Sequence, residues 1–195
     1  MQPTILLFDL GGVLVDLGDP AGAMQLNMDN ESFWKLWLSS PLVHQFETGR
    51  LDTSGFVAAF STTLGIADAV EFAQRLRAWR LPMFDGVEQY LRSLAEEHAL
   101  ALLSNTNELH WRHVLAQTDV FASFARVFLS YETGNAKPAP AAFRDVIEHF
   151  ACAPGQIAFL DDNPGNVAAA KATGMRAKQV RGFAELRQAV DELIG

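Results

Sequence analysis

Residues 4–14 read TILLFDLGGVL, a short apolar run that ends in an acid and is followed by Gly11 and Gly12. A continuous apolar run of this length is typical of a buried strand in a parallel sheet. We therefore predict a strand at residues 4–8 that places Asp9 at its carboxyl end. Later segments repeat this pattern at residues 99–103, 126–129, 157–160 and, at the edge of the sheet, 177–180.

Helical patterns separate these predicted strands. Residues 87–97 place apolar side chains at helical spacing, and residues 164–173 begin with a proline and are followed by Gly174, which are start and stop signals of a helix. Two more helices are expected at residues 109–117 and 141–150. Strands that alternate with helices predict an α/β fold with a doubly wound parallel sheet.

One stretch interrupts this alternation. Residues 17–81 contain no convincing strand, but they show helix-like segments at residues 32–38, 54–64 and 67–80. We interpret the stretch as a helical cap inserted between the first two strands. The predicted organisation is therefore an α/β core made of residues 1–16 and 82–195, and a cap made of residues 17–81.

The composition narrows the classes of partner. The formal net charge is −8 and no run of basic residues occurs, which argues against a nucleic acid or an anionic membrane as the partner. Cys152 is the single cysteine, so an intramolecular disulfide is impossible and a cytoplasmic location is expected. No leader is expected, because Asp9 interrupts the first apolar run, and no run approaches the ~20 residues of a membrane-spanning helix. The sequence gives no indication of the oligomeric state.

Polar residues follow the predicted strands. They are Asp9, the pair Ser104 and Asn105, Lys137, and the pair Asp161 and Asp162. In an open parallel sheet, ligands bind at the carboxyl ends of the strands. Each feature alone also fits ordinary structure, since acids cap helices and Ser-Asn-Thr-Asn is common in turns. Their occurrence together at one sheet edge favours a functional site.

The segments around these residues resemble the four motifs of the haloacid dehalogenase (HAD) superfamily, which has a Rossmann-like core. The matching segments are FDLGGVL at Asp9, LSNTN at Ser104, AKP at Lys137 and FLDDN at Asp161 and Asp162. The motifs occur in order over essentially the whole chain, and the helical stretch is similar to the small helical cap of one subclass. The sequences around Asp9 and Ser104 are most similar to the sugar-phosphate phosphatase branch, which includes α-D-glucose-1-phosphate phosphatase.

This resemblance implies a phosphatase that acts on a small phosphorylated substrate with Mg²⁺ as cofactor. The carboxylate of Asp9 would attack phosphorus and form an aspartyl-phosphate. Mg²⁺ prefers hard oxygen ligands, and the implied ligands are Asp9, Asp162 and the main-chain carbonyl of Gly11. Asp161 either orients Lys137 or joins the metal site by holding a bound water.

The resemblance also implies how the phosphoryl group is bound. The Ser104 hydroxyl and the Asn105 backbone N–H would contact its oxygens. Lys137 would neutralise the charge that develops there. Asn163 and Asn166 are candidates for supporting contacts, although residues at the start of a helix often face solvent.

The sequence departs from the phosphatase pattern at Gly11, where most members carry a second aspartate that protonates the leaving group. Losing such a group typically lowers the rate by about 10²–10⁴-fold. Three interpretations follow: a phosphatase whose proton relay comes from the cap or from water, a metal-independent 2-haloacid dehalogenase, and a binding protein with decayed catalysis. The first predicts a preference for sugar 1-phosphates over 6-phosphates. The Asp161–Asp162 pair argues against a dehalogenase, and the retained motifs argue against decay.

The cap offers candidate substrate-binding residues in the segment VHQFETGRLD. His44 and Glu47 could reach over the nucleophile. His44, whose pKa range suits proton transfer, is the candidate for the replacement proton relay, although a surface histidine is the more common interpretation. Phe33, Trp34 and Trp37 form an aromatic group at helical spacing. Packing between cap and core is expected of them, with stacking on a sugar ring as the alternative. Trp79 and Trp111 are likewise expected to pack.

Three residues that follow the Ser104 motif are candidates for the rim of the pocket. They are Asn107, Glu108 and His110.

Overall fold

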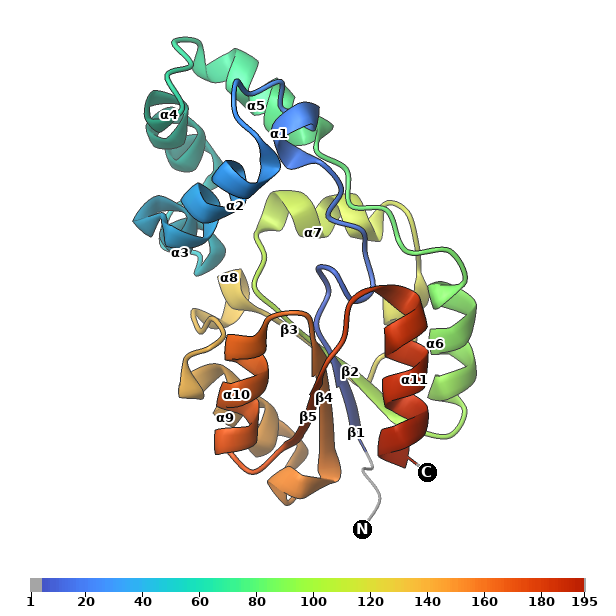
Figure 1. The fold of residues 1–195 in the computed structure, drawn as a ribbon. Coiled ribbons are helices and arrows are strands. Elements are labelled where there is room, and N and C mark those ends of the chain that lie inside the picture. Colours follow the sequence, from blue (N-terminus) through green and yellow to red (C-terminus); the bar gives the residue numbers. More distant parts are fainter. Residues whose placement is uncertain (1–4, 195) are drawn as a thin grey trace.

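Five parallel strands form a single sheet in the computed structural model, which describes residues 5–194 (Figure 1). The order across the sheet is β3-β2-β1-β4-β5. The strands are β1 (Ile5–Phe8), β2 (Ala99–Ser104), β3 (Arg126–Leu129), β4 (Ile157–Asp161) and β5 (Arg176–Gln179). The predicted doubly wound α/β class is confirmed.

Helices connect and cover these strands. Those between β1 and β2 are α1 (Pro20–Ala23), α2 (Asn30–Ser39), α3 (Pro41–Glu47), α4 (Thr53–Thr63), α5 (Ala69–Ala78) and α6 (Val87–Ala95). Those after β2 are α7 (Glu108–Leu115), α8 (Ser130–Thr133), α9 (Pro140–Phe150), α10 (Pro164–Ala172) and α11 (Gly182–Ile194). Two short 3₁₀ helices, η1 (Val120–Ser123) and η2 (Pro154–Gln156), complete the described chain.

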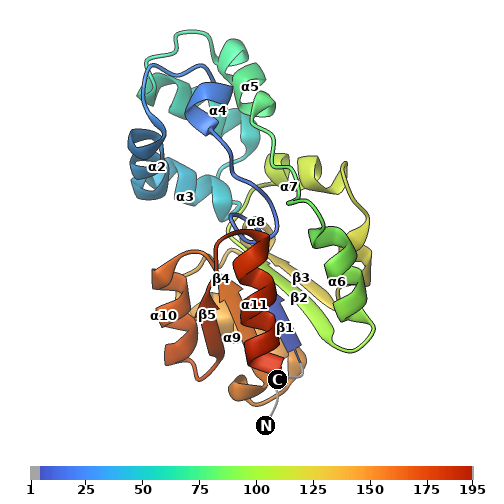
Figure 2. The ribbon, with the colours of Figure 1, turned by 45° about the vertical axis from the view of Figure 1, so that its right-hand side comes forward.

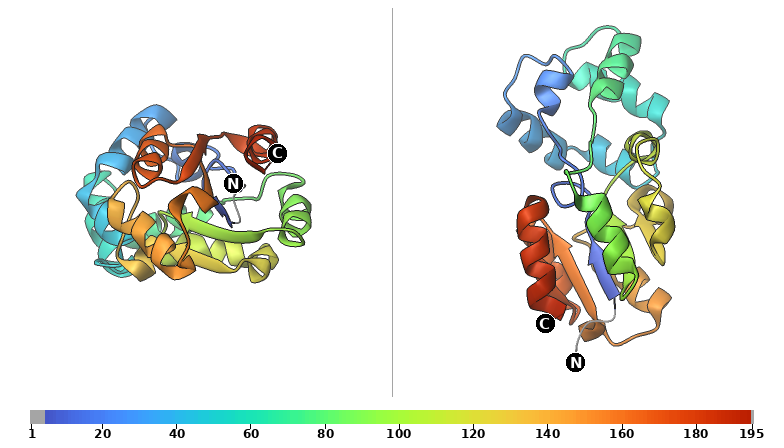
Figure 3. Two further views of the ribbon diagram at one scale, coloured as in Figure 1. Left: turned by 90° about the horizontal axis from the view of Figure 1, so that it is seen from below. Right: turned by 90° about the vertical axis from the view of Figure 1, so that its right-hand side faces the viewer.

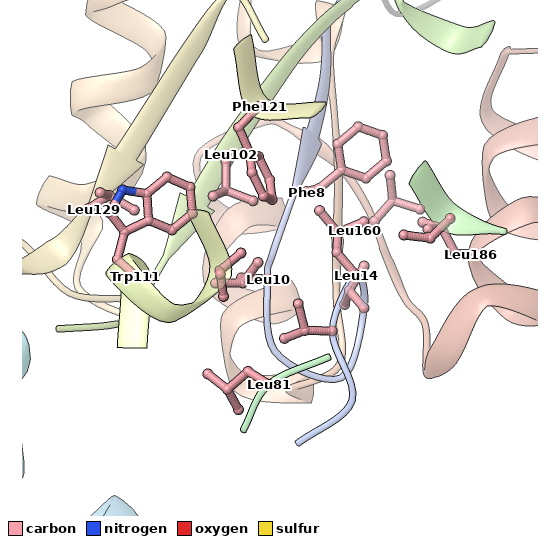
Figure 4. Close-up of a cluster of buried hydrophobic side chains, with 14 of the residues drawn as sticks. Phe8, Leu10, Leu14, Leu81, Leu102, Trp111, Phe121, Leu129, Leu160 and Leu186 are labelled. Carbon is pink, nitrogen blue, oxygen red and sulfur yellow. The ribbon is translucent and has the colours of Figure 1, made fainter. Parts of the chain in front are cut away.

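Both faces of the sheet are buried, which explains why the strands are apolar throughout rather than alternating. One face packs Phe8, Leu102 and Leu160 against α6 and α11, and Figure 4 shows these side chains converging with Leu186. The opposite face packs its side chains against α9 and α10, which Figure 2 shows in orange. Since side chains of a strand alternate between faces, each strand contributes to both cores.

The order of the strands determines where a site can form. β1 lies at the centre, with β2 on one side and β4 on the other, and Phe8 is in register with Leu102 and Leu160. The chain therefore winds in opposite directions from β1, and the carboxyl ends of β1, β2 and β4 are adjacent. A crevice forms at such a point in open α/β sheets.

Helices α1–α5 lie beyond the carboxyl ends of the strands (Figure 3). The two segments that connect them to the sheet run side by side: Asp16 N donates to Pro82 O, Phe84 N donates to Leu14 O, and Val15 is bridged to Met83 in antiparallel sense. Their own core is aromatic, with Trp37 packed edge-on against Phe56, Phe60 and Trp79. This aromatic group is continuous with the apolar cluster on the sheet face that carries Phe8 and Leu102, and the limits drawn at residues 17 and 81 stay a prediction.

A second junction ties this group to the sheet. After α3, the chain turns at Gly49, which has a φ of +69°, and passes so close to α8 that a Cβ atom there would lie 2.2 Å from the carbonyl oxygen of Tyr131. Only glycine fits both the left-handed conformation and this approach. The end of α3 is therefore held at a fixed position over the sheet edge.

The predicted elements differ from the observed ones mainly at their ends. The strand expected at residues 177–180 is Arg176–Gln179, and Thr4 of the first predicted strand lies outside the described residues. Helices α1, α3, α8 and α11 were not expected. Within residues 5–194, no helix is long and apolar enough to cross a membrane.

Candidate active site

Lys137 and Asp9 form the centre of the site. Asp9 follows β1 directly, and Lys137 lies between α8 and α9. The ammonium Nζ of Lys137 is 2.7 Å from Asp9 Oδ1 and 2.7 Å from Asp161 Oδ2. All three side chains are buried. Burial of this kind is tolerated only where opposite charges and hydrogen bonds compensate it.

The charges of this cluster set its protonation. Burial lowers the pKa of Lys137, but Asp9 and Asp161 outweigh burial and raise it overall. Burial raises the pKa of Asp9 to about 7, against the opposing effect of Lys137, and the charges of Asp161 and Asp162 add to the rise. The lysine therefore stays a cation and is the group in this cluster that favours the anionic, nucleophilic form of Asp9.

Asp161 is fully buried, and donors occupy both of its oxygens. Besides Lys137, it accepts hydrogen bonds from the backbone N–H of Asn163 at 2.8 Å and from Asn166 Nδ2 at 3.0 and 3.1 Å. Asn163 also begins α10 as its N-cap, accepting from Gly165 N. Asp161 thus orients Lys137, and the two asparagines hold Asp161.

Asp162 is the third carboxylate. Oxygens of Asp9, Asp161 and Asp162 lie within 4.8 Å of one another. Three carboxylates beside one ammonium leave two negative charges uncompensated, so the donor set suits a divalent cation with oxygen ligands. Gly12, with a φ of +69°, lets Asp162 approach: a Cβ there would lie 2.9 Å from Asp162 Oδ2.

Ser104 is the last residue of β2 and Asn105 follows it, next to the end of β1 that carries Asp9. Ser104 is buried and lines the cavity described below. The side chain of Asn105 holds the main chain of Lys137 at two points, since Nδ2 donates to Lys137 O at 2.7 Å and Oδ1 accepts from Lys137 N at 2.8 Å. The side-chain amide of Asn105 therefore positions the main chain of Lys137.

A cavity of about 880 Å³ lies between these strand ends and the helices above them. Its floor carries the polar residues already described, and its upper wall is largely aromatic and aliphatic. The wall residues are Leu17, Trp34, Trp37, Leu38, Val43, Trp79 and Leu81. A cavity of this size and character is suited to a small metabolite.

Two ionisable groups that line the cavity, Glu47 and His110, have pKa values far from those of water-exposed groups. Glu47, in the last turn of α3, accepts a hydrogen bond from Trp37 Nε1 at 3.2 Å. Burial raises the pKa of Glu47 to about 7, against the opposing effects of the Trp37 hydrogen bond and the Lys137 charge. His44, one turn earlier, is exposed at the mouth of the cavity.

His110 is the second such group. Asn107 Oδ1 accepts from His110 N, which fixes the amide so that its Nδ2 faces His110 Nδ1 at 3.1 Å. Nδ1 must then accept, and the ring proton is on Nε2. Burial, with a smaller contribution from His113, lowers the pKa of His110 to about 3. The ring is neutral near neutral pH.

The comparisons with known proteins agree with this geometry. The family model for haloacid dehalogenase-like hydrolases matches residues 3–174. The chain belongs to this hydrolase family. This HAD hydrolase is 27% identical to the D-ribitol-5-phosphate phosphatase of Bacteroides thetaiotaomicron, and the match covers 94% of each chain.

Solved structures of the family superpose on this HAD hydrolase. A HAD-family enzyme from Bacteroides thetaiotaomicron, in complex with magnesium and inorganic phosphate, matches with a TM-score of 0.77 and 26% identity over 92% of this chain and 94% of that one. The L-2-haloacid dehalogenase of Xanthobacter autotrophicus matches with a TM-score of 0.71 and 24% identity over 91% and 77%. The second likeness shows the fold alone.

The fold of this HAD hydrolase brings nearly all residues named from its sequence to one cavity. Its lining includes Asp9, Gly11, His44, Glu47, Ser104, Asn105, Lys137 and Asp162. Asp161 lies beneath, reached through Lys137. Trp79 was expected only to pack, yet it also lines the cavity. Glu108, expected near the cavity rim, instead pairs with Arg112 on the surface.

Proposed function

We propose that this HAD hydrolase is a magnesium-dependent phosphatase that acts on a small phosphorylated metabolite, a sugar or polyol phosphate, through an aspartyl-phosphate. The observation that carries the proposal is the buried cluster of Asp9, Lys137 and Asp161 with Asp162 beside it. It pairs a carboxylate nucleophile with a fixed cation and leaves an excess of negative charge for a metal.

Each residue has a defined task under this proposal. Mg²⁺, held by Asp9, Asp162 and the Gly11 carbonyl, would offset the repulsion between an anionic nucleophile and a phosphate dianion. Asp9 attacks phosphorus. Ser104 and the Asn105 N–H bind the phosphoryl oxygens, and Lys137 compensates charge that builds up on them.

The substrate class rests on the cavity and on the relatives. The cavity is closed above by tryptophans and aliphatic side chains, which suit the carbon skeleton of a sugar or polyol. The relative named as a D-ribitol-5-phosphate phosphatase supports a polyol phosphate of similar size. The −8 net charge makes a nucleic acid an unsuitable substrate.

A dehalogenase and a non-catalytic binding protein are the alternatives. The dehalogenase shares the fold, but three carboxylates whose oxygens lie within 4.8 Å of one another favour a site that binds a cation. Release of chloride from 2-haloacids that a chelator leaves unchanged would favour the dehalogenase. Decay of catalysis is hard to reconcile with an intact, buried Asp9–Lys137 pair.

A phosphate-release screen tests the proposal. Sugar 1-phosphates, sugar 6-phosphates and D-ribitol 5-phosphate are supplied with MgCl₂ or with EDTA, and the Asp9→Asn variant serves as the control. We expect metal-dependent turnover that falls to background in Asp9→Asn, and beryllofluoride, which mimics the phosphoryl group, should inhibit only with Mg²⁺ present. Full activity of Asp9→Asn would exclude Asp9 as the nucleophile.

A further inference from the structure

Hydrolysis of a phosphate ester needs proton transfer at two points. The departing alcohol oxygen requires a proton, and the water that attacks the aspartyl-phosphate must lose one. The position two residues after the nucleophile, Gly11, has no side chain for this purpose. In the described chain, the ionisable side chains that line the cavity are Asp9, His44, Glu47, His110, Lys137 and Asp162.

Most of these groups are unsuited to the transfer. Asp9 and Asp162 have other tasks, and Lys137 is a cation held by two carboxylates. His110 is neutral, since its low pKa keeps it from binding a proton, and Asn107 already occupies its Nδ1. His44 is exposed at the mouth, away from the buried floor.

Glu47 is the remaining group, and its surroundings allow it to bind and release a proton near neutral pH. It lines the same cavity as Asp9 and Lys137, and the charge of Lys137 lowers its pKa. Trp37 Nε1 donates to Oε1, so the proton of the neutral acid is carried by Oε2. The close approach at Gly49, two residues later, holds this end of α3 over the sheet.

The neighbouring helices add no competing charge. Helix α3 packs against α2, α4 and α8. The ionisable residues on these helices are Glu31 and Lys35 on α2 and Tyr131 and Glu132 on α8, and α4 has none. Besides burial, only Trp37 and Lys137 act on the pKa of Glu47, so the group is poised between its two forms near neutral pH.

We propose that Glu47 is the general acid and general base of this hydrolase, supplied by the helical segment in place of a side chain at Gly11. The proposal rests on the proposed phosphatase function. It also removes the reason to expect a preference for sugar 1-phosphates, because an acid in the wall allows poor leaving groups to depart.

The two steps balance as follows. In the first, Asp9 forms a bond to phosphorus, the bond from phosphorus to the alcohol oxygen breaks, and Oε2 of neutral Glu47 transfers its proton to that oxygen. The alcohol leaves and Glu47 is a carboxylate. In the second, Glu47 takes a proton from water, the oxygen of that water bonds to phosphorus, and the bond to Asp9 breaks. Phosphate is released and Glu47 is neutral again.

The test compares leaving groups in Glu47→Gln. With an alkyl phosphate such as D-ribitol 5-phosphate, we expect a loss of about 10²–10⁴-fold in kcat/KM. With p-nitrophenyl phosphate, whose phenolate leaves without a proton, formation of the aspartyl-phosphate should persist while its hydrolysis slows. Stopped-flow absorbance should then show a burst of about one p-nitrophenolate per active site.

Gly11→Asp provides the rescue. Position 11 is not in the left-handed region, and a Cβ there would meet only the end of the Leu17 side chain, at 3.1 Å, which can move. Leu17 lines the cavity, so the new carboxyl would enter it. In the double variant Gly11→Asp/Glu47→Gln, we expect at least part of the lost alkyl-phosphate turnover to return. Glu31→Gln, an exposed acid on α2, is the matched control and should behave as wild type.

The outcomes separate the two proposals. Equal losses with both substrates, without a burst and without rescue, would mean that Glu47 acts only on structure, and an unchanged Glu47→Gln would remove any role for it. Either result would leave the phosphatase proposal standing. If wild-type protein releases no phosphate from any substrate with Mg²⁺, the phosphatase function is wrong and the relay with it.

Discussion

Lys137 is the residue on which the charge balance of the site depends. It touches two carboxylates at 2.7 Å, and its backbone is fixed by the side chain of Asn105. The positive charge of the same lysine also lowers the pKa of Glu47. One buried cation therefore acts to lower the pKa of both the nucleophile and the candidate proton carrier.

The raised pKa of Glu47 has a measurable effect on stability. A carboxyl whose pKa rises from 4.5 to about 7 on folding disfavours the folded state once it ionises, so this cost is absent below about pH 4.5 and complete above about pH 7. Glu47→Gln removes it. We expect the variant to gain thermal stability at about pH 8 and little at about pH 5, measured by thermal unfolding in EDTA. A gain that is the same at both pH values would contradict the assigned ionisation.

Several site residues could be predicted because they follow strands. Asp9, Ser104 and Asp162 come directly after apolar runs, and parallel topology forces their convergence. The environment of Glu47 could not be predicted, because it depends on how α3 packs on α2, which brings Trp37 to it. His110 could be named as a candidate for the cavity rim because it follows the Ser104 motif, but its burial could not be predicted, since it arises from contact with Trp37 and Trp79.

At the scale of elements, short helices escaped prediction more than strands did. α3 has seven residues, too few for a helical period to be evident, although Ser40 and Pro41 form a usual N-terminal signal. α11 does show the period, since Leu186, Val190 and Leu193 are buried on one side. Its apolar face covers β4 and could have been found from the sequence.

The junction between α3 and α8 predicts a specific effect of Gly49→Ala. Ala adds a Cβ that clashes with the Tyr131 carbonyl, so the end of α3 must move and carry Glu47 with it. A displacement of about 1 Å can lower kcat about 10²-fold. Gly65→Ala is the matched control, because Gly65 has a similar φ of +70° but open space around it.

In both variants, alanine in the left-handed conformation should lower the free energy of unfolding by about 1–2 kcal/mol. Only Gly49→Ala should also lose activity. Urea unfolding and steady-state kinetics measure the two quantities separately. Equal activity of the two variants would show that the position of α3 does not matter for turnover.

At the scale of the whole molecule, the acidic cluster couples metal binding to folding. A cation that binds only the folded state stabilises it, by about 2.7 kcal/mol at a hundred times its Kd. We expect Mg²⁺ to raise the thermal midpoint of the wild type. Asp162→Asn should abolish that rise and, because it relieves repulsion among the three carboxylates, should raise the midpoint measured in EDTA. A full Mg²⁺ effect in Asp162→Asn would exclude this residue as a ligand.

The paired segments at Leu14–Asp16 and Pro82–Phe84 have a consequence for how such a protein can change. The chain leaves the sheet and returns to it at the same place. The intervening helices are therefore joined to the sheet by two segments that lie in contact with each other. Insertions with adjacent ends are tolerated readily, since they leave the host fold unstrained. New selectivity can therefore be acquired by exchanging the helices as a block that keeps an acid at the place of Glu47, while the nucleophile, the lysine and the metal-binding acids stay in register beneath them.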